Sequence, residues 1–167
     1  MSWIMAVERP DTPDASLLRR EYYDEVASRW YGRPATAAEI EQGLTDDGAD
    51  QLALPTGDFV VGRYRGRPAA CGGVLLLAQA PVIDGTSPAT AELTRVFVRP
   101  FARGTGGGGA LLDALEDAAR RLGARRLALD TRHDLVEARG LYAKHGYREV
   151  APYSEGPYRE RWFAKEL

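Results

Sequence analysis

The sequence predicts a single α/β domain built on a mixed β-sheet. Short apolar runs that read as strands alternate with segments of helical periodicity, in the order β-α-α-β-β-β-α-β-α-β-β. A helical segment joins the strands at 91–98 and 126–130, and such a crossover favours a parallel pair. The 167 residues suffice for one domain with a buried core and show no internal repeat, so we expect 1–167 to form one domain.

An apolar stretch at 2–7 predicts the first strand. The first helix is expected over about 14–28, because apolar residues follow at helical spacing. Asp14 is its expected N-cap, since an aspartate side chain can accept hydrogen bonds from the free N–H groups of a first turn. Gly32 should end this helix.

The next helix starts at a capping-box pattern, with Thr36 at the cap and Glu39 three residues later. It is expected to run to about Asp46, and the polar residues 46–50 then form a loop.

Three strands are expected in the middle of the chain, at 59–64, 69–78 and 91–98. A hairpin turn at 65–68 joins the first two, and a loop at 81–90 precedes the third. The Gly72-Gly73 pair inside the second strand predicts a bend, a bulge or a close backbone approach.

The segment that ends at Leu122 predicts an amphipathic helix with the apolar stripe Leu111, Leu112, Leu115, Ala118, Ala119 and Leu122. A buried strand follows at 126–130. A last helix is expected over 134–145, capped by Asp134 with Glu137 three residues on, and ended by Gly146. Strands at 147–150 and 161–166 complete the order.

Composition excludes several classes of protein. The formal net charge of −2 gives no general attraction to nucleic acid or to an anionic membrane. No apolar run has the length of a membrane helix, and no secretory signal pattern opens the chain, so we expect a cytoplasmic protein. Cys71 is the single cysteine and reads as a small core residue, and no Cys/His cluster has metal-ligand spacing, so no metal is expected.

The compositional oddity is a run of five glycines within six positions, Gly104 and 106–109, directly before the amphipathic helix. Helix N-termini bind anions through free N–H groups and the helix dipole. Glycine inside a helix costs about 1 kcal/mol relative to alanine, so a ligand close to bare backbone is the expected compensation. The loop therefore predicts an anion cradle.

Three interpretations of the glycine run remain. A flexible linker fits poorly with the ordered flanks. Gly104, Gly106 and Gly109 match the dinucleotide pattern G-x-G-x-x-G, and Asp130 ends the next strand where a ribose-binding acid would stand. However, that turn normally begins at the strand end, whereas Val98 lies well before the first glycine, and too little chain follows Asp130 for the remaining units. The third interpretation is the pyrophosphate of coenzyme A, to which Arg103 would add charge.

The residues from Arg103 to Gly108 resemble the R/Q-x-x-G-x-G/A signature of the GCN5-related N-acetyltransferase (GNAT) superfamily. The stretch 91–100 is similar to the family's fourth strand, and 138–147 resembles its A-x-x-L-Y-x-x-x-G-F/Y block. The two motifs together cover about 91–150. This resemblance implies a mixed, mostly antiparallel central sheet of six to seven strands with about four helices, in which strands four and five are parallel and splayed.

The resemblance further implies acetyl-CoA (coenzyme A) as co-substrate and transfer of its acetyl group to a primary amine of a small molecule or a peptide N-terminus. A regulatory module that binds acetyl-CoA without catalysis is the alternative. No nucleic-acid or membrane partner is implied, and homodimers are common in the family.

Particular residues take roles through the resemblance. The expected cofactor-binding residues are Val96, Phe97, Val98, Arg103, Gly104, Thr105, Gly106, Gly107, Gly108, Gly109 and Tyr142. A backbone N–H near Val98 would stabilise the charge that develops on the thioester oxygen. Glu92 is the expected general base, and Tyr142 the general acid that protonates the leaving thiolate.

The acceptor side is less defined. Trp30, Tyr31, Glu92 and Tyr153 are the expected substrate-binding residues, within a lining that also includes Arg29, Arg33, Ser154, Glu155 and Tyr158. The sequence departs from the family at Leu135, where an asparagine often contacts the cofactor. His133 or Asp134 is a candidate substitute for that contact, and His133 is also a candidate second base.

Overall fold

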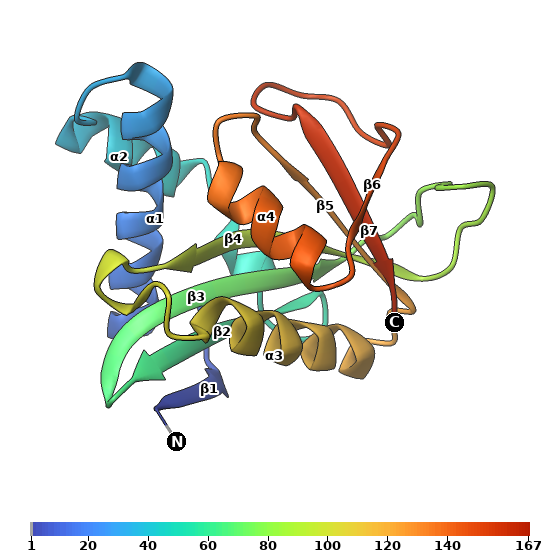
Figure 1. The fold of residues 1–167 in the computed structure, drawn as a ribbon, viewed down its shortest axis with the longest axis horizontal. Helices are drawn as coiled ribbons and strands as arrows, with labels where there is room; N and C mark the ends of the chain where they lie inside the picture. The colour runs from blue at the N-terminus through green and yellow to red at the C-terminus, as the bar shows by residue number, and fades with distance from the viewer. Residues whose placement is uncertain (1) are drawn as a thin grey trace.

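A seven-stranded mixed sheet crosses the molecule in the computed structural model, which describes residues 2–167 (Figure 1). The strands lie in the order β1-β2-β3-β4-β5-β7-β6 and are antiparallel except for β4 and β5. The strands are β1 Trp3–Val7, β2 Gly57–Tyr64, β3 Arg67–Leu76, β4 Thr90–Val98, β5 Arg126–Thr131, β6 Arg148–Val150 and β7 Arg161–Glu166. The α-helices are α1 Pro13–Tyr31, α2 Ala37–Thr45, α3 Gly107–Arg121 and α4 Val136–Lys144, with short 3-10 turns η1 Ala49–Gln51 and η2 Pro100–Ala102. The predicted fold class is confirmed.

Helices cover both faces of the sheet (Figure 1). On one face, the apolar stripe of α3 packs with α4 against strand residues such as Leu93, Leu127 and Leu129. On the other face, Ala15 and Leu18 of α1 pack on a second core that contains Cys71. Cys71 is fully buried, as predicted, and burial raises the pKa of its thiol. None of the helices in 2–167 has the length and hydropathy that a membrane crossing requires.

The parallel strands β4 and β5 pair over only three residues. Thr90 to Glu92 pair with Arg126 to Ala128, and no pairing between these two strands follows. Each strand keeps its other neighbour, since β4 stays paired to β3 up to Val98 and β5 to β7 up to Thr131. We call the unpaired stretch, 93–98 beside 129–131, the β4–β5 opening. It confirms the predicted splayed, parallel pair.

A β-bulge lies in β4 beside this opening. Gly73 opposes Thr94 and Cys71 opposes Phe97, so β4 carries one extra residue. Arg95, within the bulge, has a left-handed φ of 57°. The Gly72-Gly73 pair was expected to mark a bend, a bulge or a close approach, and it does lie opposite the bulge. A side chain at either glycine would collide with Leu115 or Leu52.

Two predicted helix caps are wrong. Thr12, not Asp14, caps α1, because its hydroxyl accepts from the Ala15 N–H at 3.3 Å, while the Asp14 carboxylate pairs with Arg63. At α4 the cap is Leu135 and forms no side-chain hydrogen bond. The expected cap there, Asp134, is held instead by a bidentate pair with Arg132 at 2.8 Å. In both cases an arginine binds the carboxylate that local spacing had assigned to the helix.

Other predicted ends are confirmed. The Thr36–Glu39 capping box is complete, and Gly32 and Gly146 adopt left-handed φ values of 69° and 89° after their helices. The loop at 46–50 differs from expectation, because it contains the start of η1 and because the side chain of Asp47 is fully buried.

Candidate active site

Glu92 is the last residue of β4 that pairs with β5, so it lies where the β4–β5 opening begins. Its neighbours Ala91 and Leu93 pack toward α3 and α4, so strand alternation turns Glu92 to the α1 face. Asp130 of β5 faces the same way, because Leu127 and Leu129 also pack toward α3 and α4. Two carboxylates from neighbouring parallel strands therefore share one face.

The Glu92 carboxylate is partly buried and accepts a hydrogen bond from the Tyr153 hydroxyl at 2.8 Å. Burial raises the pKa of Glu92, and the Asp130 charge raises it further, whereas the Tyr153 hydrogen bond opposes the shift. A carboxylate with a raised pKa is a better proton acceptor than an exposed one. The structure thus brings together two predicted residues, Glu92 and Tyr153, that are far apart in sequence.

Tyr142 reaches the same region from the opposite face. It projects from α4, which lies on the sheet in front of β4 and beside β5 (Figure 1), and its ring packs on Tyr147 and Phe163 at centroid distances of 5.8 and 6.0 Å. Burial raises the pKa of Tyr142, and the neighbouring Tyr22 and Asp130 add to the shift. Tyr22 and Asp130 belong to the α1 face, so Tyr142 lies close enough to the opening to feel groups on that face.

Asp130, Arg159 and Tyr22 were missing from the predicted site. Burial raises the pKa of Asp130, and the Arg159 guanidinium, at 3.8 Å, opposes that shift. Burial also raises the pKa of Tyr22 to about 12. Strand alternation after the parallel crossover offered a signal for Asp130, whereas no local pattern marks Tyr22 or Arg159.

The backbone of β4 presents polar groups to the opening. The Arg99 N–H donates to Ala69 in β3 at 2.7 Å, so alternation turns the preceding Val98 N–H toward the unpaired edge. The Val98 carbonyl accepts from Arg103 Nε at 2.8 Å. An extended ligand arm could add to this edge as a further strand, in the way peptides extend a sheet.

The glycine loop divides into two parts. Gly104 and Gly106 have φ values of 78° and 89° and open space around them. Gly106 is the N-cap of α3 and supplies no side-chain cap, so the first-turn N–H groups remain available to an anion. This part fits the predicted pyrophosphate cradle.

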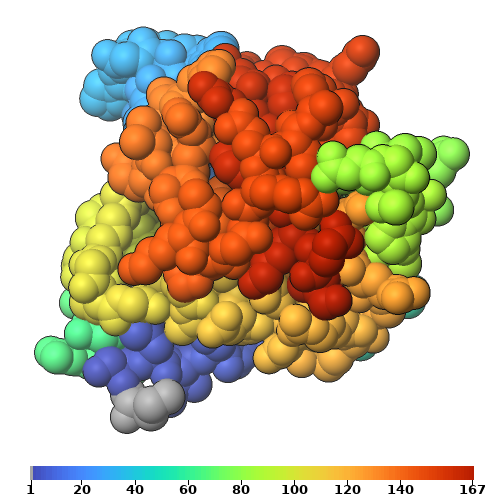
Figure 2. Space-filling view, turned by 45° about the vertical axis from the view of Figure 1, so that its right-hand side comes forward, coloured from blue at the N-terminus to red at the C-terminus, as the bar shows by residue number. Residues whose placement is uncertain are grey.

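The second part packs on the protein itself. A side chain at Gly107 would overlap the Trp3 ring, one at Gly108 would approach Leu141 within 2.9 Å, and one at Gly109 would approach His145 within 2.6 Å. The expectation that ligand approach explains these three glycines is therefore corrected, because contacts with β1 and α4 require them. Figure 2 shows the yellow loop segment at the surface beside the orange α4 and the blue N-terminal strand.

Two predicted cofactor residues have their side chains engaged elsewhere. The Thr105 hydroxyl donates to the Ala102 carbonyl at 2.5 Å and accepts from Trp3 Nε1 at 2.9 Å, which leaves its backbone for a ligand. Arg103 pairs with Glu25 of α1 at 2.7 Å, so that carboxylate offsets part of the charge that Arg103 would offer to a phosphate.

Aromatic residues from two distant segments meet on the acceptor side. Trp30, at the end of α1, forms an edge-to-face pair with Tyr158 at 4.7 Å, and Arg132 lies over the Trp30 ring at 5.3 Å. Tyr31 stacks with Arg33 at the exposed end of α1. His133 is exposed, and its Nδ1 accepts a hydrogen bond from Arg161 at 3.0 Å.

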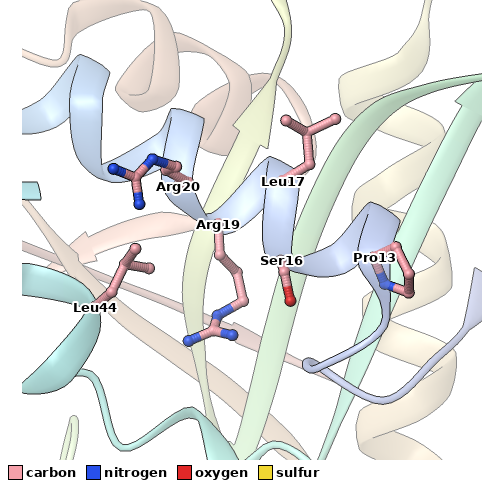
Figure 3. A pocket seen from close by; sticks show the side chains of 6 residues that line it. All are labelled: Pro13, Ser16, Leu17, Arg19, Arg20 and Leu44. Atoms are coloured by element: carbon pink, nitrogen blue, oxygen red, sulfur yellow. The ribbon is translucent and has the colours of Figure 1, made fainter. Parts of the chain in front are cut away.

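A groove elsewhere on the surface is separate from this region. It lies between α1 and α2 and is lined by Pro13, Ser16, Leu17, Arg19, Arg20 and Leu44 (Figure 3). Arg19 is tied there to the buried Asp47. Residues 2–167 bring no three His, Cys, Asp or Glu side chains together as a metal site would.

A model of the acetyltransferase (GNAT) family matches residues 18–147. The chain belongs to this family. The family predicted from the glycine loop and the tyrosine block is thereby confirmed, together with its acetyltransferase class, for which acetyl-CoA is the co-substrate. The β4–β5 opening and the α3 N-terminus described above are parts of this GNAT fold.

The similar proteins and structures also carry acetyltransferase names. The chain is 36% identical over 107 residues to an IAA acetyltransferase of Azospirillum brasilense, a match that spans 64% of this chain and 63% of that protein. It is 28% identical over 156 residues to an uncharacterized N-acetyltransferase, C1271.07c, of Schizosaccharomyces pombe, covering 92% of this chain and 87% of that one. The fold is similar, with a TM-score of 0.63 and 17% identity over 99% of both chains, to a GNAT family acetyltransferase from Elizabethkingia anophelis with acetyl-CoA bound.

Proposed function

We propose that this GNAT domain, spanning 1–167, is an N-acetyltransferase that moves the acetyl group of acetyl-CoA to a primary amine of a small molecule or a peptide N-terminus by direct attack. The observation that carries the proposal is the β4–β5 opening. It has an unpaired backbone edge up to Val98, the partly buried Glu92 carboxylate at its start and the buried Tyr142 from the opposite face. A thioester and an amine could meet there from opposite faces of one sheet.

The chain holds acetyl-CoA mainly through backbone. Val96, Phe97 and Val98 offer the edge for the pantetheine arm, and the loop from Gly104 to Gly109, with Thr105 and Arg103, offers the α3 N-terminus to the pyrophosphate. Within residues 2–167 no side chain caps the α3 N-terminus by a hydrogen bond, because its N-cap is Gly106.

Three groups serve the chemistry. Glu92, directly or through water, removes the proton from the incoming ammonium, and its raised pKa suits that task. The Val98 N–H stabilises the negative charge that develops on the thioester oxygen as the nitrogen–carbon bond forms. When the carbon–sulfur bond breaks, Tyr142 gives its proton to the thiolate, and the raised pKa of its hydroxyl keeps that proton in place beforehand.

The acceptor amine enters from the α1 face. Trp30, Tyr31 and Tyr153 line its approach, and Tyr153 also fixes the orientation of Glu92. A cytoplasmic location and a homodimer stay predictions.

The test combines binding with turnover. We expect acetyl-CoA to raise the melting temperature of the protein, and we expect free thiol to appear with at least one member of a broad panel of primary amines and peptides. Binding of acetyl-CoA without transfer to any acceptor would favour the regulatory module instead. A melting temperature that acetyl-CoA leaves unchanged, together with no transfer, would contradict both functions.

A further inference from the structure

Arg95 is the residue at which β4 changes register. Before it, Ala91 and Leu93 face α3 and α4, while Glu92 faces α1. After it, Phe97 packs with the α1 core, while Val96 and Val98 pack against the α3 and α4 side. In a regular strand Glu92 and Phe97 would lie on opposite faces, because they are five positions apart. The bulge puts both on the acceptor face and leaves Val96 and Val98 on the other.

This conformation is costly for arginine. The φ of 57° at Arg95 is left-handed, a region that a non-glycine residue occupies at a cost of about 1–2 kcal/mol. Such conformations persist where surrounding contacts enforce them. The contacts of the Arg95 side chain should therefore show what enforces this one.

Asp47 supplies those contacts. The Arg95 guanidinium donates to both the carboxylate and the backbone carbonyl of Asp47, and to Thr94 Oγ1 at 3.0 Å. The Asp47 side chain is fully buried and also accepts from Arg19 of α1 at 2.7 Å and from the Tyr23 hydroxyl. One carboxylate in the loop before η1 thus connects α1 to the β4 bulge.

We propose that Asp47 is a positioning residue that holds Arg95 in its left-handed conformation and so sets the register of the cofactor edge, Val96 to Val98, relative to Glu92. The inference rests on the proposed use of that edge for coenzyme A. Asp47 touches neither substrate, and it acts only through the bulge.

Two substitutions at Arg95 separate side-chain locking from backbone strain. Glycine accepts a left-handed φ freely, so Arg95→Gly permits the bulge without enforcing it. Arg95→Ala keeps the backbone strain of the left-handed φ and removes the side-chain hydrogen bonds to Asp47. Neither variant leaves Asp47 unpaired, because Arg19 and Tyr23 still bind it. We expect the Kd for coenzyme A, measured by titration calorimetry, to rise about tenfold in Arg95→Ala and less in Arg95→Gly. Asp47→Asn should weaken binding at least as much as Arg95→Ala.

Thr86→Val is the matched control. It removes a 2.6 Å hydrogen bond from the buried Arg126, at the closed end of the β4–β5 pair. This variant should lose stability but keep the Kd of the wild type. A Kd within twofold of wild type in both Arg95 variants, equal losses in the two, or an equal loss in Thr86→Val would overturn the positioning role.

The outcome is distinguishable from the failure of the proposed function. The binding series needs no amine. If the wild type binds coenzyme A but acetylates no amine, the transferase proposal fails. The order of the Kd values among the variants still decides the role of Asp47 in that case. No binding of coenzyme A to the wild type would overturn both.

Discussion

The two sides of the β4–β5 opening are built differently. The cofactor side comes from one continuous stretch, β4 to the start of α3, and offers mainly backbone groups, since Thr105 and Arg103 are bonded to the protein itself. The acceptor side gathers side chains from α1, β4, β5 and the loop before β7. Two carboxyl groups with raised pKa values, those of Glu92 and Asp130, lie on this second side.

The difference teaches how each partner would be recognised. Backbone donors suit a constant ligand such as coenzyme A, because their geometry depends little on side-chain identity. Side chains from several segments can change one at a time, so they suit an acceptor that varies. Five predictions test this division, from the largest expected effect to the smallest.

Replacing the base should have the largest effect. Glu92→Gln is expected to lower kcat/KM for the amine about 1,000-fold, because the ammonium then loses the carboxylate that takes its proton. In the wild type, kcat/KM should rise with pH as Glu92 loses its proton, at a pH above the usual glutamate range, and this limb should vanish in the variant. Stopped assays across pH 5–9 measure this pH dependence of kcat/KM in the wild type and in the variant. An unchanged limb would assign the base elsewhere.

The same variant has a stability consequence of determined sign. The pKa of Glu92 is raised in the folded state, so the fold binds this proton more tightly than the unfolded chain does. Its ionisation therefore destabilises the fold as pH rises through the raised pKa. Glu92→Gln should melt higher than the wild type at pH 8, and the difference should shrink toward low pH. A lower melting temperature at pH 8 would contradict the burial argument.

Tyr142→Phe tests the residue that joins the two sides. We expect kcat to fall about 100-fold, because the leaving thiolate loses its proton donor, while the Kd for coenzyme A stays within twofold of wild type. Tyr147→Phe is the matched control, since that ring packs on Tyr142 but its hydroxyl donates to Glu116 at 3.0 Å. The control should lose stability and keep kcat. Equal losses of kcat in both would mean that packing, not proton transfer, matters.

A glycine pair separates packing from ligand binding on the cofactor side. Gly107→Ala should lower the stability of the unliganded protein by about 1–3 kcal/mol, because the new methyl group meets the Trp3 ring. Gly140→Ala in α4 meets nothing and should stabilise the protein by about 1 kcal/mol. Thermal and denaturant unfolding without ligand measure both. If Gly107→Ala lost only coenzyme A binding, ligand approach would explain that glycine after all.

The smallest effect is expected at the position where the chain departs from its family. Leu135→Asn places an amide at the uncapped start of α4, where it can donate to the pantetheine arm. One added hydrogen bond should tighten coenzyme A binding about threefold to tenfold, as titration calorimetry would show. Unchanged affinity would mean that the backbone edge already completes the cofactor site.

Much of the cofactor side was predictable, because its signals are local. The strand at 91–98, the glycines that follow and the apolar stripe of α3 are each readable within a few turns of chain, and the structure places them as expected. Local spacing predicted the wrong cap where an arginine, distant in one case and two residues away in the other, bound the carboxylate. Arg63 and Arg132 took the carboxylates of Asp14 and Asp134, which spacing alone had assigned to helix caps.

By itself, the sequence determined the family, the order of elements and the parallel pair, since these depend on periodicity, turn residues and contiguous motifs. Only the tertiary structure decided which side chains share the opening. Glu92 meets Tyr153 across 61 positions, and Asp47 binds Arg95 across 48. Such contacts arise from the packing of whole elements, and the extra residue in β4 reverses which face each later side chain takes.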